Sequence, residues 1–267
     1  MTLPGGLWRH GECRRDWSFR PLTGEIEMSI LEAGRGSESV PQRVTAVLST
    51  VLAELGGAAA QRDAVRALSV ADRQYLMRRI ASLIGLEESW IAARCLTCGA
   101  GFDVPVRESE LPVKPAGEGY PFADVETSLG PVRFRVPVGA DQEAIAAIPD
   151  LQAARRALAL RCAVAPQSGE LSGELSDEDL DRAEQALEAI APEVATQAQA
   201  ACPDCGRPAT VELDPYHCLG AAPGGLFLDI HILASAYHWS EKEILALPRE
   251  RRRLYLSFVD RSRGMVS

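Results

Sequence analysis

The sequence predicts an α+β fold in which helical segments and small antiparallel β units are joined by a zinc-ribbon-like four-cysteine site. Three observations support this prediction. The 267 residues are 46% hydrophobic and 24% charged, which are the proportions of a globular protein. Several segments repeat apolar residues at helical spacing. Two Cys-x-x-Cys-Gly turns, at 95–99 and 202–206, are each flanked by residues that alternate as in strands.

The first half of the chain carries three helix signals. Thr23 is placed to cap a helix that runs to about residue 33. Over residues 41–55 apolar positions recur at intervals of three and four, which predicts an amphipathic helix that Gly56-Gly57 ends. Ser69 and Asp72 resemble a capping box, so the next helix is expected over residues 69–84.

The second half contains a similar mixture of elements. Alternating apolar residues over 125–136, interrupted by Gly130-Pro131, predict a β-hairpin. The composition favours helices over residues 141–162 and 177–190, and strands on both sides of the second cysteine turn. Three short helices are expected in the C-terminal stretch 226–259.

Changes in composition divide the chain into four parts. We expect an N-terminal half over 1–107 and a second half over 122–218, each with one cysteine turn. Residues 108–121 are rich in Pro, Gly and Glu and are predicted to be a linker. Residues 219–267 are predicted to form a helical C-terminal tail.

The two halves share a pattern that indicates an internal duplication. Phe19-Arg20-x-x-x-Gly24 recurs as Phe134-Arg135-x-x-x-Gly139, and each copy is followed by helical stretches and a cysteine turn. We therefore predict that residues 16–106 and 122–214 superpose about an approximate twofold axis through the metal. The alternative is a chance recurrence of a common strand, turn and helix order, since few identities align.

The paired cysteine turns predict one structural zinc ion. A Cys-x-x-Cys turn directs two sulfurs to one side of a loop, and two turns complete a tetrahedron of thiolates. Four protein ligands leave no open coordination position, which favours a structural role over hydrolysis. An iron site of rubredoxin type and a dithiol redox pair are the weaker alternatives. The predicted ligands are Cys95, Cys98, Cys202 and Cys205.

The remaining cysteines have no clear function in the sequence. Cys162 lies on an apolar helical stretch and is predicted to be a core residue, whereas Cys13 and Cys218 are unassigned. His217, beside Cys218, is a candidate substitute ligand, but an ordinary surface turn is the stronger interpretation.

Charge and hydropathy limit the expected partners. A formal net charge of -9 makes nucleic acid an unfavourable default partner. No stretch resembles a signal peptide and no apolar run approaches the length of a membrane span, so we expect a cytoplasmic protein without a membrane partner. An odd number of cysteines, seven, fits that reducing compartment.

The C-terminal stretch 226–259 is predicted to bind a partner rather than to belong to the zinc-centred core. It follows a Gly- and Pro-rich break and holds more apolar residues than so short a segment can easily bury alone. Its arginines would attract an acidic surface, whereas docking on the chain's own helices is the alternative. The candidate partner-binding residues are Trp239, Arg251, Arg252, Arg253 and Tyr255.

Several segments together resemble the T-even-phage-type baseplate hub assembly chaperones, a family with relatives in tailed phages and phage-like contractile injection systems. Besides the cysteine turns, the segments are Arg20-Pro21-Leu22-Thr23-Gly24, Val132-Arg133-Phe134-Arg135, Gly139-Ala140-Asp141-Gln142-Glu143, His238-Trp239-Ser240-Glu241 to Leu247, and Arg251-Arg252-Arg253-Leu254-Tyr255-Leu256. The chain departs from the family at 219–225, which is Gly- and Pro-rich where a longer, Trp-rich region is expected.

The resemblance implies a non-enzymatic assembly chaperone or minor structural component of a contractile tail baseplate. The implied partners are baseplate, hub or tail-tube proteins, and the chain could stay in the assembled particle. The sequence contains no nucleophile elbow, Walker loop, dinucleotide fingerprint or His-Glu-x-x-His helix, which agrees with the absence of an enzymatic role. A zinc-ribbon nucleic-acid-binding regulatory protein is the main alternative, and an enzyme with an unrecognised site is the weaker one.

Overall fold

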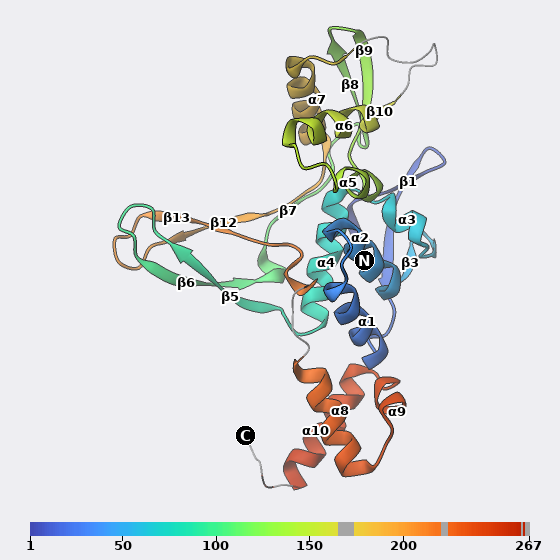
Figure 1. The fold of residues 1–267 in the computed structure, drawn as a ribbon, viewed down its shortest axis with the longest axis vertical. Coiled ribbons are helices and arrows are strands. Elements are labelled where there is room, and N and C mark those ends of the chain that lie inside the picture. Colours follow the sequence, from blue (N-terminus) through green and yellow to red (C-terminus); the bar gives the residue numbers. More distant parts are fainter. Residues whose placement is uncertain (165–173, 220–223, 263, 265–267) are drawn as a thin grey trace.

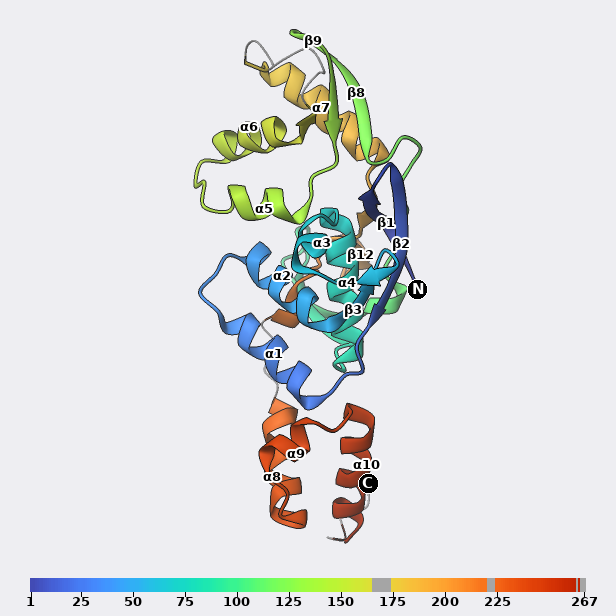
Figure 2. The ribbon, with the colours of Figure 1, turned by 90° about the vertical axis from the view of Figure 1, so that its right-hand side faces the viewer.

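A computed structural model of the chain describes residues 1–164, 174–219, 224–262 and 264. The chain forms three bodies stacked along the long axis, with a β-stranded arm that projects from the middle of the stack (Figure 1). The central body lies within residues 2–83, the second body within residues 122–190, and the C-terminal module within residues 224–262 (Figure 2). This mixture of helices with small antiparallel sheets and a four-cysteine cluster confirms the predicted fold class.

The central body is a four-stranded antiparallel sheet packed against helices. Its strands are β1 (Thr2–Arg9), β2 (Glu12–Phe19), β3 (Leu52–Leu55) and β4 (Ala58–Ala59), in that order across the sheet. Its helices are α1 (Gly24–Arg35), α2 (Val40–Val51), α3 (Arg62–Arg66) and α4 (Val70–Leu83). The β1–β2 hairpin was not expected from the sequence, and it contributes the fully buried Leu3 and Leu7 to the core.

The helix predicted over 41–55 is too long. It ends at Val51, and Leu52–Leu55 forms β3, in which Leu52 lies opposite Phe19 of β2. In this strand Leu52 and Leu55 are at most 1% exposed, so both are buried as the apolar pattern predicts. The strand is favoured over a longer helix because it also supplies hydrogen-bond partners to the backbone of β2.

The second body repeats this plan on a smaller scale. Its strands are β8 (Phe122–Thr127), β9 (Gly130–Arg135) and β10 (Ala163–Val164), and its helices are α5 (Gly139–Ile145), α6 (Leu151–Cys162) and α7 (Asp177–Ile190). The single helix expected over 141–162 is two helices. Pro149 lies between them, and Asp150 caps α6 by accepting a hydrogen bond from the backbone N–H of Ala153.

Both bodies share a core element order, which supports the predicted duplication. A hairpin is followed by two helices, then by a strand that pairs with the second hairpin strand, and later by a long helix; the central body has β4 and α3 in addition before that helix. The register also agrees, because Leu52 lies opposite Phe19 and Ala163 lies opposite Phe134. In each body Ser and Asp three residues apart begin the last helix, as Ser69 with Asp72 in α4 and as Ser176 with Asp179 in α7. The twofold relation through the metal stays a prediction.

The segment predicted as a linker, 108–121, contains ordered structure. Glu108–Glu110 forms a 3-10 turn, η1, and Val113–Lys114 forms β7, which pairs with β11 (Glu193–Val194). A second 3-10 turn, η2 (His217–Leu219), ends the second half. These elements surround the base of the arm.

A joint between α4 and α5, the first joint, fixes the second body on the central body. Ser69 bridges to Val138, and the backbone N–H of Gly139 donates to the carbonyl of Leu68 at 3.0 Å. Arg73 is fully buried beneath this contact, and its guanidinium donates to Thr45 Oγ1 at 2.9 Å and to the Pro41 carbonyl at 2.6 Å. A Cβ on residue 139 would come within 3.0 Å of that guanidinium, so the position requires glycine.

The second joint attaches the C-terminal module to α1. The module consists of α8 (Gly224–Tyr237), α9 (Glu241–Leu245) and α10 (Arg249–Ser262), which confirms the three predicted helices. Thr23 bridges to Pro248, and the N–H of Gly24 donates to the Leu247 carbonyl at 3.3 Å. Arg252 is 1% exposed and pairs with Glu27 of α1 and Asp229 of α8.

We predict that Gly139→Ala destabilises the protein strongly only while Arg73 is present. Arg73→Ala should lower the free energy of unfolding by about 3 kcal/mol, because buried acceptors lose a charged donor. Gly139→Ala should cost about 1 to 3 kcal/mol, since the pinned guanidinium cannot move aside. In the double variant the second cost should shrink to less than about 1 kcal/mol. Urea unfolding of all four proteins measures this coupling, and additive effects would contradict the close contact.

Candidate metal centre

Two β-hairpins form the arm and carry the four predicted ligands. The first pairs β5 (Glu88–Arg94) with β6 (Gly101–Arg107), and the second pairs β12 (Gln197–Ala201) with β13 (Pro208–Glu212). Each hairpin ends in a cysteine turn, and the two lie side by side along the arm (Figure 1). The inward residues of both hairpins are buried or half-buried, whereas the outward residues are exposed.

The two turns have the same backbone geometry. The N–H of Gly99 donates to the Cys95 carbonyl, and the N–H of Gly206 donates to the Cys202 carbonyl, both at 2.9 Å. Gly99 has φ 77° and Gly206 has φ 70°, in the left-handed region that favours glycine. The glycine after each cysteine pair therefore lets the chain reverse while both sulfurs face the same side.

The four sulfurs converge at spacings that suit one tetrahedral metal ion. Cys95 Sγ lies 3.6 Å from Cys205 Sγ, and Cys98 Sγ lies 3.7 Å from Cys202 Sγ. All four sulfurs lie within 4.8 Å of one another. A tetrahedron with Zn–S bonds of about 2.3 Å has sulfur separations of about 3.8 Å. The residues present fit zinc, and within the described segments no other group of His, Cys, Asp and Glu forms such a cluster.

The electrostatics of the cluster indicate how a bound cation would act on it. Backbone N–H groups of Cys98 and Thr97 point at the Cys95 sulfur and lower the pKa of that thiol to about 6. The Arg207 N–H acts in the same direction on Cys205, yet desolvation and the neighbouring sulfurs raise the pKa of Cys205 to about 12. One thiolate is thus favoured and further ionisation is opposed. A divalent cation reverses this balance, and its binding releases protons.

A metal ion held here would have a structural role. All four ligands come from protein, so the coordination is closed. The two ligand pairs are separated by 103 residues, and the second body lies within that interval. Closing a loop of about 100 residues removes denatured-chain entropy worth about 4 to 5 kcal/mol by the disulfide estimate. A bound ion would therefore tie the hairpins of the two halves into one arm.

The other cysteines and His217 lie outside the cluster. Cys162 is buried, as predicted, and packs in the core of the second body, while Cys218 is buried in the central core. Cys13 is exposed and its thiol donates to the Gly5 carbonyl. His217 lies at the base of the arm, where its Nε2 is 3.9 Å from a carboxylate oxygen of Glu108, so the substitute-ligand interpretation is not supported.

The predicted partner-binding residues fall into three groups. Arg251 and Arg253 are exposed on α10. Trp239 and Tyr255 are half-buried, and their rings meet edge to face at 4.9 Å within the module. Arg252 has a different role from the one expected, because it is buried and holds the module on α1. The reason is tertiary, because Arg252 lies on the face of α10 that packs against α1 and α8, whereas Arg251 and Arg253 lie outside that face.

The C-terminal module carries the exposed apolar surface that its excess of apolar residues predicts, but the residues that form it were not among the candidate partner-binding residues. Phe227 and Leu228 of α8 are 49% and 56% exposed, and Leu254 and Phe258 of α10 are 53% and 44% exposed. A signal was present, because α8 is apolar on all sides and a single helix of a small module cannot bury every face.

No protein-family model, curated protein or solved structure matches the chain. Within the described residues, none of the helices has the length and apolar character that crossing a bilayer requires. The fold and the site define the chain as an α+β protein with a four-cysteine cluster that is compatible with zinc.

We predict one zinc ion per chain, bound jointly by both cysteine turns. Cys98→Ser or Cys205→Ser should abolish stoichiometric zinc in elemental analysis of the purified protein and lower the free energy of unfolding by several kcal/mol, because the loop is no longer closed. Cys13→Ser, which changes an exposed cysteine outside the cluster, is the matched control and should keep the metal. A wild-type protein without stoichiometric zinc would contradict the assignment.

Proposed function

We propose that this chain is a non-enzymatic assembly chaperone or minor structural component of a contractile, phage-like tail baseplate. One observation carries the proposal: the segments that resemble the baseplate hub assembly chaperones meet at the joints of the structure. Thr23 and Gly24 lie at the end of one of these segments and contact the C-terminal module in the second joint. Gly139 lies at the start of another segment and contacts Leu68 in the first joint. Leu247 and Arg252, from the terminal segments, complete the second joint.

This distribution supports a family relationship rather than chance. Arg251, Arg253 and Leu254 of the matched segments are exposed, but Gly24, Gly139 and Arg252 determine how the bodies are held together. The cysteine turns, which belong to the same resemblance, meet in the metal cluster. The features shared with the family are therefore those that would preserve one architecture.

The proposed partner surface is the outer face of the C-terminal module. Arg251, Leu254, Phe258 and Arg261 follow one another at intervals of three, four and three, which places them on one face of α10. All four are exposed. Among the residues described, no carboxylate lies within ion-pair distance of Arg251, Arg253 or Arg261, whereas Arg249 and Arg252 are paired. Such a face suits an apolar partner surface flanked by acidic groups.

The alternative, a zinc-ribbon nucleic-acid-binding regulator, has one observation in its favour. Trp90 on the arm is 72% exposed, and an exposed aromatic ring is suited to stacking on a base. The charge of the arm opposes it, because residues 87–110 and 196–213 hold seven acidic and three basic side chains. Phosphate groups would be repelled by that balance.

We predict that Leu254→Asp with Phe258→Asp prevents co-purification with baseplate, hub or tube proteins encoded by the same genome. The double change places two charges in an apolar contact and should weaken binding at least about 100-fold. Leu151→Asp with Leu160→Asp is the matched control, since both leucines are exposed on α6 of the second body, outside the C-terminal module. Co-expression followed by affinity capture measures the effect. Equal capture by both variants would reject this surface, and no capture by the wild type would reject the proposed function.

A further inference from the structure

The two joints of the structure use one recognition pattern. In each, a short helix, a turn and a longer helix present Ala-Leu followed five residues later by a buried arginine. We call the element that inserts the leucine and the arginine the donor of the joint, and the helix that receives it the acceptor, whatever the direction of the hydrogen bonds. The first donor is the α3–α4 turn, with Leu68 and Arg73. The second is the α9–α10 turn, with Leu247 and Arg252. The offset between them is 179 residues throughout, and the following positions Ile80 and Val259 are both buried.

The acceptor surfaces of the two joints also make the same backbone hydrogen bonds. Each acceptor is a helix that begins with glycine, α5 at Gly139 and α1 at Gly24. The glycine N–H donates to the leucine carbonyl of the donor turn, at 3.0 Å in the first joint and 3.3 Å in the second. In return, an N–H at the start of the donor helix, from Val70 or Arg249, donates to a carbonyl of the acceptor segment.

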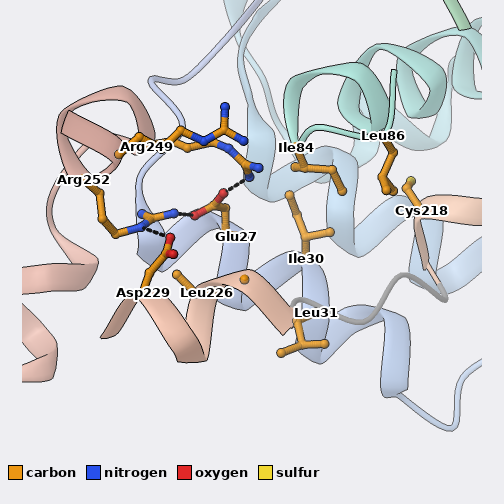
Figure 3. A pocket seen from close by; sticks show the side chains of 12 residues that line it. Glu27, Ile30, Leu31, Ile84, Leu86, Cys218, Leu226, Asp229, Arg249 and Arg252 are labelled. Atoms are coloured by element: carbon orange, nitrogen blue, oxygen red, sulfur yellow. Dashed lines mark hydrogen bonds and ion pairs between the residues drawn. The ribbon is translucent and has the colours of Figure 1, made fainter. Parts of the chain in front are cut away.

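The chemistry beneath the two joints differs. Arg73 donates to a hydroxyl and to backbone carbonyls beside the central core. Arg252 instead pairs with the carboxylates of Glu27 and Asp229, beside a cavity of about 220 Å³ between the module and α1 (Figure 3). Arg252 Nη1 and Arg249 Nε are buried without a partner among the described residues. The second joint is therefore more ionic and less completely packed than the first.

We propose that the acceptor surface on α1, around Gly24 and Glu27, binds the C-terminal module of a second copy of this chain as well as its own. The contacts at the joint would be the same in either arrangement, so an exchange between copies sacrifices no interaction at that joint. Only residues 220–223 connect the module to η2 of the same chain. The two joints show that two glycine-initiated helices each receive a turn with the same placement of leucine and arginine.

Charge is compatible with module binding to the body of either copy. Residues 224–262 hold six basic and five acidic side chains, whereas the whole chain has a net charge of -9. The module is thus the slightly basic part of an acidic protein, and the body of either copy attracts it. The occupant with demonstrated complementarity to the α1 surface is this module. This proposal does not depend on the proposed function.

Two full-length variants test the proposal when they are mixed. Gly24→Leu blocks the acceptor, because a Cβ at that position falls 2.9 Å from the Leu245 backbone. Arg252→Ala disables the donor but leaves the acceptor intact. Neither variant alone has a working pair, whereas the mixture combines a working donor with a working acceptor on different chains. Light scattering after size exclusion should give a monomer for each variant and a species of twice the mass for the mixture.

Controls separate this result from misfolding and from unrelated association. Both variants should keep their zinc and their far-ultraviolet circular dichroism. Mixing Gly24→Leu with the wild type should give much less dimer, because the wild-type module already occupies its own acceptor. The double variant Gly24→Leu/Arg252→Ala should not combine with the Gly24→Leu chain. A mixture of the two folded single variants that remains monomeric would overturn the proposal.

If Gly24→Leu does not fold, Glu27→Arg replaces it as the blocked acceptor. The introduced guanidinium would repel Arg249 and Arg252 of any incoming module, while the change lies on a helix face that is free once the module leaves. Mixing Glu27→Arg with Arg252→Ala must again produce the double-mass species. Its absence would reject trans binding in the same way.

Discussion

The convergence of four sulfurs is the constraint on which the architecture depends. Two cysteine turns with 103 residues between them meet within 4.8 Å, so everything in that interval must leave the arm and return to it. The second body occupies the interval, and β7 pairs with β11 where its two ends come together. The pKa of Cys95 is lowered and that of Cys205 is raised, so the four thiols do not all ionise readily by themselves. A cation bound to all four thiolates would stabilise their convergence.

The two joints are a second set of contacts that holds the parts of the chain together. They add to other contacts between the central and second bodies, such as the ion pair of Arg66 with Glu143 and the edge-to-face contact of Trp8 with Phe122. Arg73 and Gly139 fix the second body on the central body, and Arg252 and Glu27 fix the C-terminal module at the opposite end (Figure 1). A linear series of bodies results, in which an exposed apolar face is left on the last one.

The resemblance to baseplate hub assembly chaperones and the structure bear on different questions. The resemblance suggests what the chain assembles with, whereas the structure indicates which residues are available for it. Arg252 illustrates the difference, because it lies within a resembling segment but is used inside the chain. Leu254 and Phe258, only two and six residues further along α10, remain exposed.

Local patterns in the sequence determined most of the helices and the two cysteine turns whose sulfurs the structure brings together. A cysteine turn carries its geometry in consecutive residues, and Ser69 with Asp72 or Ser240 with Glu243 caps a helix through neighbours alone. Tertiary structure decided what depends on distant partners. Leu52–Leu55 became a strand because β2 needed backbone partners, and Gly139 was required because Arg73 lies against it. Arg252 became a joint residue because Glu27, 225 residues earlier, met it in the folded chain.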